Sequence, residues 1–278
     1  MITIGDEAIP TSIHNERRWS AVFLGLIVGL LLGLLWLPDL TLERKLYLLL
    51  HGVCAQTHNI VAGGVQLPLC ARDSGMYLSY LVTFGVSWWR GRGRAGRMPP
   101  LPLALVFLGL FLVMVADGIN STLAELLLPY AYTPRNDLRL LTGMGAGSAL
   151  AVVVQFILNN ALWRDVEPPK PIIGQWRELA IIGALDAAIV AALALDTPLL
   201  AWPLALLVVV GLIGNLTIVL TLVIAIALGR ANRVVRLTQL AHPATIGLLL
   251  TLVMIITMAR YRIWMEVTGL VPMPVLPK

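Results

Sequence analysis

The sequence predicts an all-α fold: a polytopic helical membrane protein with about seven transmembrane helices. Hydrophobic residues make up 58% of the 278 residues, whereas Asp, Glu, Lys and Arg together make up 13%, far below the roughly 25% of ordinary globular proteins. The mean hydropathy is +0.85. The apolar residues also gather into runs of about 20, the length that a helix needs to cross about 30 Å of hydrocarbon. These observations exclude a sizeable domain outside the membrane.

Seven apolar runs have the length of membrane spans. They cover residues 19–37, 74–89, 101–117, 140–162, 178–195, 200–228 and 244–264. The first run follows Arg17 and Arg18, as in a signal peptide, but it is long for that role and no small-residue cleavage site follows it. We therefore expect a retained anchor. Residues 42–50 then predict a short interfacial helix that leads the chain to Cys54.

The basic residues of the loops predict the orientation of the chain. The N-terminus and the loops at 90–100, 164–177 and 229–243 hold 12 Lys and Arg residues, and the opposite loops and the C-terminal tail hold 8. Short loops that are rich in Lys and Arg stay on the cytoplasmic side of a membrane. We therefore expect a protein of the cytoplasmic membrane with its N-terminus inside and its C-terminus outside.

Three prolines at positions 168, 169 and 171 interrupt the chain after the fourth apolar run. Because proline breaks a helix, this segment predicts a linker. The linker divides the chain into residues 1–165, a core of four spans with polar loops, and residues 166–278, a bundle of three spans.

Several function classes are excluded by the same residues. The net charge of +5 does not indicate nucleic-acid binding, because the basic residues lie between apolar runs and do not form one face. No GxxxxGK loop and no GxGxxG loop after a strand is present, so nucleotide chemistry of the soluble type is not expected. The chain also shows no internal repeat of the kind found in inverted-repeat transporters.

A first group of reactive side chains lies between the first two spans. Cys54 and His58 are followed by a glycine pair and then by Cys70 and Asp73. Thiolate, imidazole and carboxylate groups are all zinc ligands, so these four residues form a candidate zinc site. A disulfide between Cys54 and Cys70 is the favoured alternative and would contribute about 3 kcal/mol for a loop of this length. Free thiols packed as small apolar groups are the third alternative.

The same segment resembles the signature of an uncharacterised family of bacterial and archaeal integral membrane proteins, domain of unknown function 2085. That signature reads C-H-Q and, several residues later, P-x-C-A-R-C-x-G. Here Cys54 is followed by Ala55 and Gln56, and residues 68–75 read PLCARDSG. Ala55 replaces the usual His and Asp73 replaces the second Cys, so a metal site needs substitute ligands here. The resemblance covers residues 45–150, implies a helical membrane fold and implies no activity.

A second polar group lies between the third and fourth spans. Asp117 and Asn120 end the third span, and Arg135, Asn136 and Arg139 precede the fourth. With seven spans, this loop emerges on the same face of the membrane as the cysteine segment. Guanidinium groups bind phosphate through paired hydrogen bonds, and the first N–H groups of a helix add to such a site.

These two groups together predict an extracytoplasmic polar pocket for membrane lipid or another amphiphile with an anionic head group. Arg72 joins the binding residues, because it lies beside Asp73 at the start of the second span. In an enzymatic version, Asp73 or Asp117 acts as the general base while arginines stabilise phosphate charge. The alternative interpretation is structural: helix caps, turns and arginines at the lipid surface.

Two polar residues lie inside predicted spans. Asp186 is at the centre of its span and Asn215 is in the middle of the next. An ionisable group at this depth is costly, so a proton-coupled transporter that uses Asp186 is an alternative function. The structural alternative is a hydrogen bond between neutral Asp186 and Asn215, worth about 0.6 kcal/mol.

A further hypothesis needs no site at all. The chain is then an accessory, non-catalytic subunit of a larger membrane complex, in which the polar groups cap helices and a disulfide closes the hairpin. Lipid and such a complex are the expected partners, and nucleic acid is not. The residues alone are compatible with binding and with catalysis.

Overall fold

The computed structural model describes residues 13–36, 38, 40–54 and 57–271, and most of them are helical. Ala55 and Gln56 of the first motif lie outside the described residues. The helices are α1 (Ile13–Trp36), α2 (Leu42–Leu49), α3 (Ala71–Trp89), α4 (Leu101–Glu125), α5 (Asn136–Leu162), α6 (Trp176–Ala194), α7 (Pro198–Ala227), the short 3-10 helix η1 (Leu237–Leu240) and α8 (Ala241–Val267). The strands are β1 (Asn59–Ala62), β2 (Val65–Cys70), β3 (Ala95–Arg97) and β4 (Glu167–Pro171).

Five of the described helices are long and apolar enough to cross a membrane. They are α1, α4, α5, α7 and the continuous helix formed by η1 and α8. The two other predicted spans form α3 and α6, which are not among these five. Helix α3 opens with Arg72 and Asp73, and α6 contains Arg177, Glu178 and Asp186. The structure therefore supports a helical membrane protein with five candidate spans, and it does not confirm the predicted seven.

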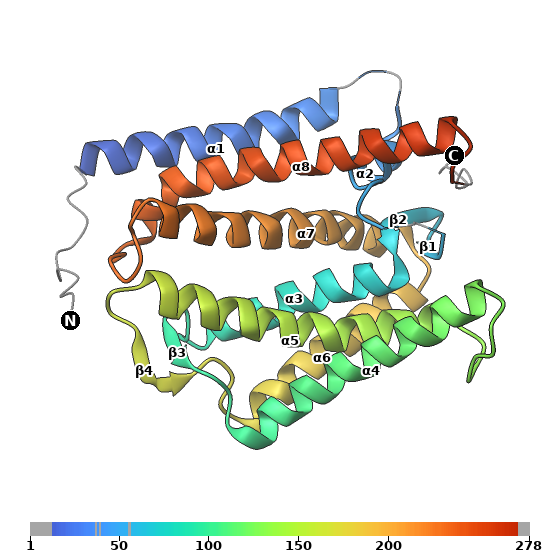
Figure 1. Cartoon of the computed structure of the whole chain (residues 1–278), viewed down its shortest axis with the longest axis horizontal. Coiled ribbons are helices and arrows are strands. Elements are labelled where there is room, and N and C mark those ends of the chain that lie inside the picture. The colour runs from blue at the N-terminus through green and yellow to red at the C-terminus, as the bar shows by residue number, and fades with distance from the viewer. Residues whose placement is uncertain (1–12, 37, 39, 55–56, 272–278) are drawn as a thin grey trace.

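The polar character of α3 follows from its position. In Figure 1, α3 and α5 lie side by side in the middle of the molecule, with α7, α8 and α1 on one side and α4 and α6 on the other. Helix α3 packs against α5, α6 and α7, and its Ser79, Thr83 and Ser87 are buried. A helix enclosed by protein does not need an apolar surface all round, because its polar groups contact other helices instead of lipid.

Helices α3 and α5 approach each other through glycines. A Cβ atom at Gly143 would lie 2.0 Å from the carbonyl oxygen of Arg72, and one at Gly147 would lie 2.0 Å from that of Met76. On the opposite helix, a Cβ at Gly75 would lie 2.2 Å from the carbonyl oxygen of Leu140. Small residues spaced four apart are typical of close helix packing in membranes. This contact holds the start of α3 against the start of α5.

The helices end in two polar regions at opposite ends of the bundle (Figure 1). We call one the hairpin end; it carries the β1–β2 hairpin, the start of α3 and the loop between α4 and α5. We call the other the strand-pair end; it carries β3, β4 and the start of α6. The short helix α2 lies at the hairpin end, with Leu46 and Tyr47 buried.

The proline-rich segment is a strand and not only a linker. Residues 167–171 form β4, which pairs in parallel with β3 in the register Ala95 to Glu167 and Arg97 to Pro171. Helices α6 and α7 pack against α3, and α8 packs against α1. The division of the chain into residues 1–165 and 166–278 stays a prediction.

Candidate functional site

The β1–β2 hairpin is closed by a glycine pair that the backbone requires. Gly63 has φ +57° and Gly64 has φ +73°, the left-handed conformations that a two-residue turn with the twist of a hairpin needs. The N–H of Gly63 donates a hydrogen bond of 2.5 Å to Oδ1 of Asp196. Leu67 and Leu69 of β2 are fully buried. The predicted cysteine-containing hairpin is thus present, and its tip is anchored to the turn between α6 and α7.

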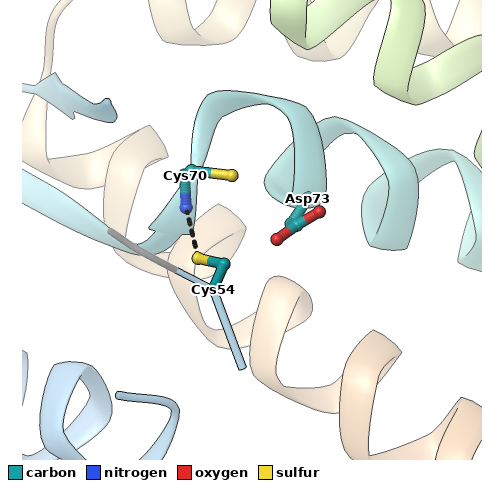
Figure 2. A group of neighbouring side chains, drawn as sticks. All are labelled: Cys54, Cys70 and Asp73. Carbon is teal, nitrogen blue, oxygen red and sulfur yellow. Dashed lines mark hydrogen bonds between the residues drawn. The ribbon is translucent and has the colours of Figure 1, made fainter. Parts of the chain in front are cut away.

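Three of the predicted ligands meet at the start of α3. Cys70 is the last residue of β2 and the N-cap of α3, and Asp73 lies in the first turn of that helix. The sulfur atoms of Cys54 and Cys70 and a carboxylate oxygen of Asp73 all lie within 4.8 Å of one another. Figure 2 shows the three side chains turned toward a common space. All three residues are half-buried.

The two sulfur atoms are not bonded to each other. Cys54 and Cys70 are both free thiols, and the N–H of Cys70 donates a hydrogen bond of 3.4 Å to the sulfur of Cys54. The disulfide favoured by the sequence is therefore not formed in this structure. The predicted fourth zinc ligand is elsewhere as well: Nε2 of His58 lies 3.1 Å from Oε1 of Glu125, and His58 is not part of the ligand group.

The environment raises the pKa of two of these groups, Cys54 and Asp73. Burial raises the pKa of the Asp73 carboxyl, although hydrogen bonds with both cysteines and the charge of Arg72 oppose this effect. The pKa of the Cys54 thiol lies well above its usual range, first because of its hydrogen bond with Cys70 and then because of burial. Two thiols and a carboxyl that share one small space cannot all ionise without a cation between them.

The second predicted group forms a network around Asp117. This carboxylate is 1% exposed. Its oxygen atoms accept hydrogen bonds from Nη2 of Arg72 at 2.5 Å, from the Tyr132 hydroxyl at 2.7 Å and from the Thr142 hydroxyl at 3.3 Å. The same Nη2 of Arg72 donates to Oγ of Ser121 at 3.1 Å. The network joins α3, α4, α5 and the loop between α4 and α5.

Asn120 fixes the course of this loop. Its side-chain oxygen accepts from the N–H of Ala131 at 2.8 Å, and its amide nitrogen donates to the carbonyl oxygen of Tyr132 at 2.8 Å. The Tyr132 hydroxyl thereby reaches Asp117, and this hydrogen bond raises the pKa of Tyr132. The contacts of Asn120 are satisfied by the backbone, so its geometry indicates a positioning role.

A surface hollow of about 480 Å³ lies beside this network. It is lined by His58, Ala124, Glu125, Pro134, Arg135, Asn136 and Arg139. The guanidinium group of Arg139 lies 3.5 Å from Glu125 and 3.4 Å from the side-chain oxygen of Asn136. Arg135 pairs with the exposed Asp137. The side-chain nitrogen of Asn136 donates to the carbonyl oxygen of Asn59 in β1 at 3.4 Å, which connects the hollow to the hairpin.

The two polar residues of the predicted spans do not contact each other. Oδ2 of Asp186 accepts a hydrogen bond of 2.7 Å from Oγ of Ser79, which also lies 2.7 Å from Oγ of Ser148. Among the described residues, the side-chain oxygen of Asn215 is buried without a hydrogen-bond partner. The expected hydrogen bond between Asp186 and Asn215 is thus replaced by one between α6 and the central helix α3, whose serine the sequence analysis did not consider.

One buried charged group at the hairpin end was missed by the sequence analysis. Oε2 of Glu266 lies 2.8 Å from Nε2 of His51, and Oε1 accepts from Nε of Arg262 at 2.7 Å. Arg262 and Glu266 are four residues apart near the end of α8, a spacing that places them on one helix face. That spacing was a usable signal, whereas the contact with His51 joins residues far apart in the sequence. The group attaches the region after α2 to α8.

Comparison with known proteins identifies a relationship for part of the chain. Residues 54–153 match the model of a family described as "Predicted membrane protein (DUF2085)". This match confirms the family resemblance. It spans Cys54, Cys70, Asp73, Asp117 and Arg139, which are the residues of the two polar groups. No curated protein and no solved structure matches the chain. The DUF2085 match and the five apolar helices support a membrane protein, and the orientation of the termini stays a prediction.

Proposed function

We propose that this integral membrane protein binds the anionic head group of an amphiphile at its hairpin end, which faces away from the cytoplasm. This proposal rests on the burial and the long hydrogen-bond distances of Arg139, which lines the hollow. Arg139 is 5% exposed, yet its guanidinium reaches its hydrogen-bond partners only at 3.4 to 3.5 Å. Guanidinium–carboxylate hydrogen bonds are normally about 2.7–2.9 Å long.

A buried guanidinium with long contacts retains much of its desolvation cost. A phosphate or carboxylate in the hollow would offset this cost through short, charge-assisted hydrogen bonds. The exposed Arg135 lies at the rim of the same hollow and pairs there with Asp137, so an incoming anion would compete with that exposed carboxylate for the guanidinium. The acyl chains of such an amphiphile would lie along the exposed apolar surface of α4, which includes Ile119.

The geometry gives Asp117, one of the two predicted bases, a different role. Asp117 is buried, is paired with Arg72 and accepts further hydrogen bonds from Tyr132 and Thr142. A carboxylate with these contacts is a weak proton acceptor. We therefore assign Asp117 the role of positioning Arg72, and the proposal is one of binding rather than of catalysis.

The test compares two lipids that differ only in head group. The purified full chain in detergent micelles is titrated with dioleoyl phosphatidylglycerol or dioleoyl phosphatidylcholine, and bound lipid is counted by native mass spectrometry. We expect the wild type to prefer the anionic lipid and Arg139→Gln to lose that preference. Arg164→Gln, at the strand-pair end, is the matched control and should keep it. Equal binding of both lipids by the wild type, or an unchanged preference in Arg139→Gln, would contradict the proposal.

The two alternative functions receive different support. Proton-coupled transport through Asp186 gains none from the described residues, because neither the Ser79 hydroxyl that contacts it nor the Ser148 hydroxyl bonded to Ser79 titrates near neutral pH. An accessory subunit predicts a protein partner that survives mild detergent extraction. The same purification tests this alternative, since a constant stoichiometric partner and no bound lipid would favour it over head-group binding.

A further inference from the structure

We infer that Cys54, Cys70 and Asp73 form a zinc-binding site whose fourth coordination position is open to water or a ligand. This inference is independent of head-group binding, because it uses a different group of side chains. Its basis is the convergence of two thiols and a carboxylate from two segments of the hairpin end.

The distances fit a tetrahedral metal ion. With Zn–S bonds of about 2.3 Å and Zn–O bonds of about 2.0–2.2 Å, the ligand atoms of a tetrahedral site lie about 3.6–3.8 Å apart. The three ligand atoms lie within 4.8 Å of one another. A separation of this size is about 1 Å above the tetrahedral value at most, which is within the range of side-chain rotation.

The backbone holds the three residues in place. Cys70 and Asp73 are three residues apart across the first turn of α3, so their side chains lie on the same face of the helix. The N–H of Ala71 donates to the carbonyl oxygen of His58 at 2.9 Å, and β1 pairs with β2 in the register Asn59 to Cys70. These contacts hold the chain that carries Cys54 beside the start of the helix.

A backbone hydrogen bond orients one of the proposed ligands. The N–H of Cys70 points at the sulfur of Cys54, as in metal sites whose ligands are oriented by further hydrogen bonds. Zinc binds cysteine as the thiolate, so binding would release the protons of the thiols.

The donor set selects the metal. Two thiolates disfavour Mg²⁺ and Ca²⁺, which prefer oxygen ligands, and the carboxylate disfavours Cu⁺, which prefers sulfur. Zinc accepts both types. Structural zinc sites have four protein ligands, whereas sites with three protein ligands keep the fourth position open. His58 pairs with Glu125, so we assign the fourth position to water or to an external ligand.

Metal binding is tested directly on the purified full chain. The protein is reduced, freed of metal and titrated in detergent with Co²⁺ as a spectroscopic probe and then with Zn²⁺ as a competitor. We expect one equivalent of Co²⁺ to give thiolate-to-metal charge-transfer absorption and the intense visible bands of a tetrahedral site, and Zn²⁺ to abolish both. Cys54→Ser and Cys70→Ser should weaken Zn²⁺ binding by about 100-fold or more, by comparison with the 10–100-fold losses of outer-sphere mutations.

Two further variants still test the site if the serine variants fold poorly. Asp73→Cys adds a third thiolate and should bind Zn²⁺ more tightly than the wild type, with stronger charge-transfer absorption, which damaged folding does not produce. His58→Ala should bind as the wild type does, because His58 lies outside the site. The inference is overturned if the reduced wild type takes up no metal, if Asp73→Cys brings no gain, or if the isolated protein carries a Cys54–Cys70 disulfide and remains metal-free after reduction.

Discussion

The two ends of the helical bundle carry similar polar residues but use them differently. At the strand-pair end, Glu178 is 1% exposed, lies 2.7 Å from Nη2 of Arg92 and 3.4 Å from Nε of Arg90, and accepts from the N–H groups of Gly174 and Gln175. The buried carboxylate thus has two close partners at 2.7 Å, the Arg92 guanidinium and the N–H of Gly174. The strand-pair end is therefore a structural joint between α3, α6 and the β3–β4 pair.

At the hairpin end the pairing is less complete. Cys54, Cys70 and Asp73 converge there with their ligand atoms within 4.8 Å of one another, and Arg139 lines a hollow with contacts of 3.4 to 3.5 Å. Buried polar groups are normally well paired, and those that are not call for an explanation. The contrast indicates that polar groups which saturate one another support the fold, whereas those that converge without doing so can receive a ligand.

The largest effect is expected from Glu178→Ala at the strand-pair end. Removing one partner of a buried, hydrogen-bonded ion pair costs about 3–5 kcal/mol, because the remaining charge stays buried. We expect a lowered unfolding midpoint in detergent, measured by circular dichroism during heating. Co²⁺ binding by the protein that remains folded should be unchanged, since the zinc site lies at the other end.

The matched variant is Glu178→Gln, which can still accept from Gly174 and Gln175 and should lose less stability. If Glu178→Ala left the midpoint unchanged but reduced metal or lipid binding, the assignment of the strand-pair end as purely structural would be wrong.

The next effect concerns the glycine contact that positions the hairpin end. Gly143→Ala places a Cβ atom 2.0 Å from the carbonyl oxygen of Arg72, so α3 and α5 must separate at the start of both helices. Overpacking of this kind costs about 1–3 kcal/mol. Because Arg72 and Asp73 move with α3, we also expect weaker Co²⁺ binding, measured by the same titration.

Gly214→Ala is the control for this variant. No atom lies within 4 Å of a Cβ at that position, and alanine is the better helix former by about 0.5–1 kcal/mol. Its midpoint should be unchanged or higher. Equal midpoints for the two alanine variants would show that the α3–α5 contact tolerates a wider separation.

The positions of the helices could be predicted from the sequence because the apolar runs report burial in lipid directly. The glycine pair at 63–64 likewise identified the hairpin, and the number of apolar runs between the two polar groups placed them at one end. Whether α3 crosses the membrane could not be judged from its apolar run. Its polar residues, such as Ser79, are accommodated by neighbouring helices, and that packing is a tertiary property.

Partners of side chains were the least predictable feature. His58 lies four residues from Cys54, yet its ring contacts Glu125 in α4, and the proline-rich segment pairs with β3, about 70 residues earlier in the chain. Neither contact can be predicted from local residue spacing, because the two partners lie far apart in the sequence. Whether two cysteines form a bond depends on the direction of their Cβ atoms, which spacing alone does not specify.

A smaller effect is expected from Tyr132→Phe, which tests whether the Asp117 network is structural in the same sense as the strand-pair end. The variant removes a hydrogen bond of 2.7 Å to Asp117. Tyr132 is 39% exposed, so solvent screening reduces the loss to about 1 kcal/mol. At pH 7 the unfolding midpoint of the variant should lie modestly below that of the wild type. The metal and lipid titrations should be unchanged, and the midpoints of both proteins are then followed to higher pH.

The pH dependence of this difference has a defined sign. The pKa of Tyr132 in the folded protein is raised above its ordinary value of about 10, so its stabilising hydrogen bond is fully present below that pH. The contribution is lost as the pH rises through the folded pKa. The midpoints of wild type and Tyr132→Phe should therefore converge in alkaline solution, and a difference that grows with pH would refute the assignment.

The smallest effect on stability is expected from Arg135→Ala, at the rim of the hollow. The side chains of Arg135 and Asp137 are 67% and 54% exposed, and exposed ion pairs contribute little because water and salt screen them. We expect no measurable change in the unfolding midpoint. Lipid binding should still respond, because Arg135 faces the same hollow as Arg139: the preference for phosphatidylglycerol should weaken, by less than in Arg139→Gln, and the weakening should shrink as salt is added. A preference that is independent of both arginines would mean that the hairpin end, like the strand-pair end, keeps its charges for the fold alone.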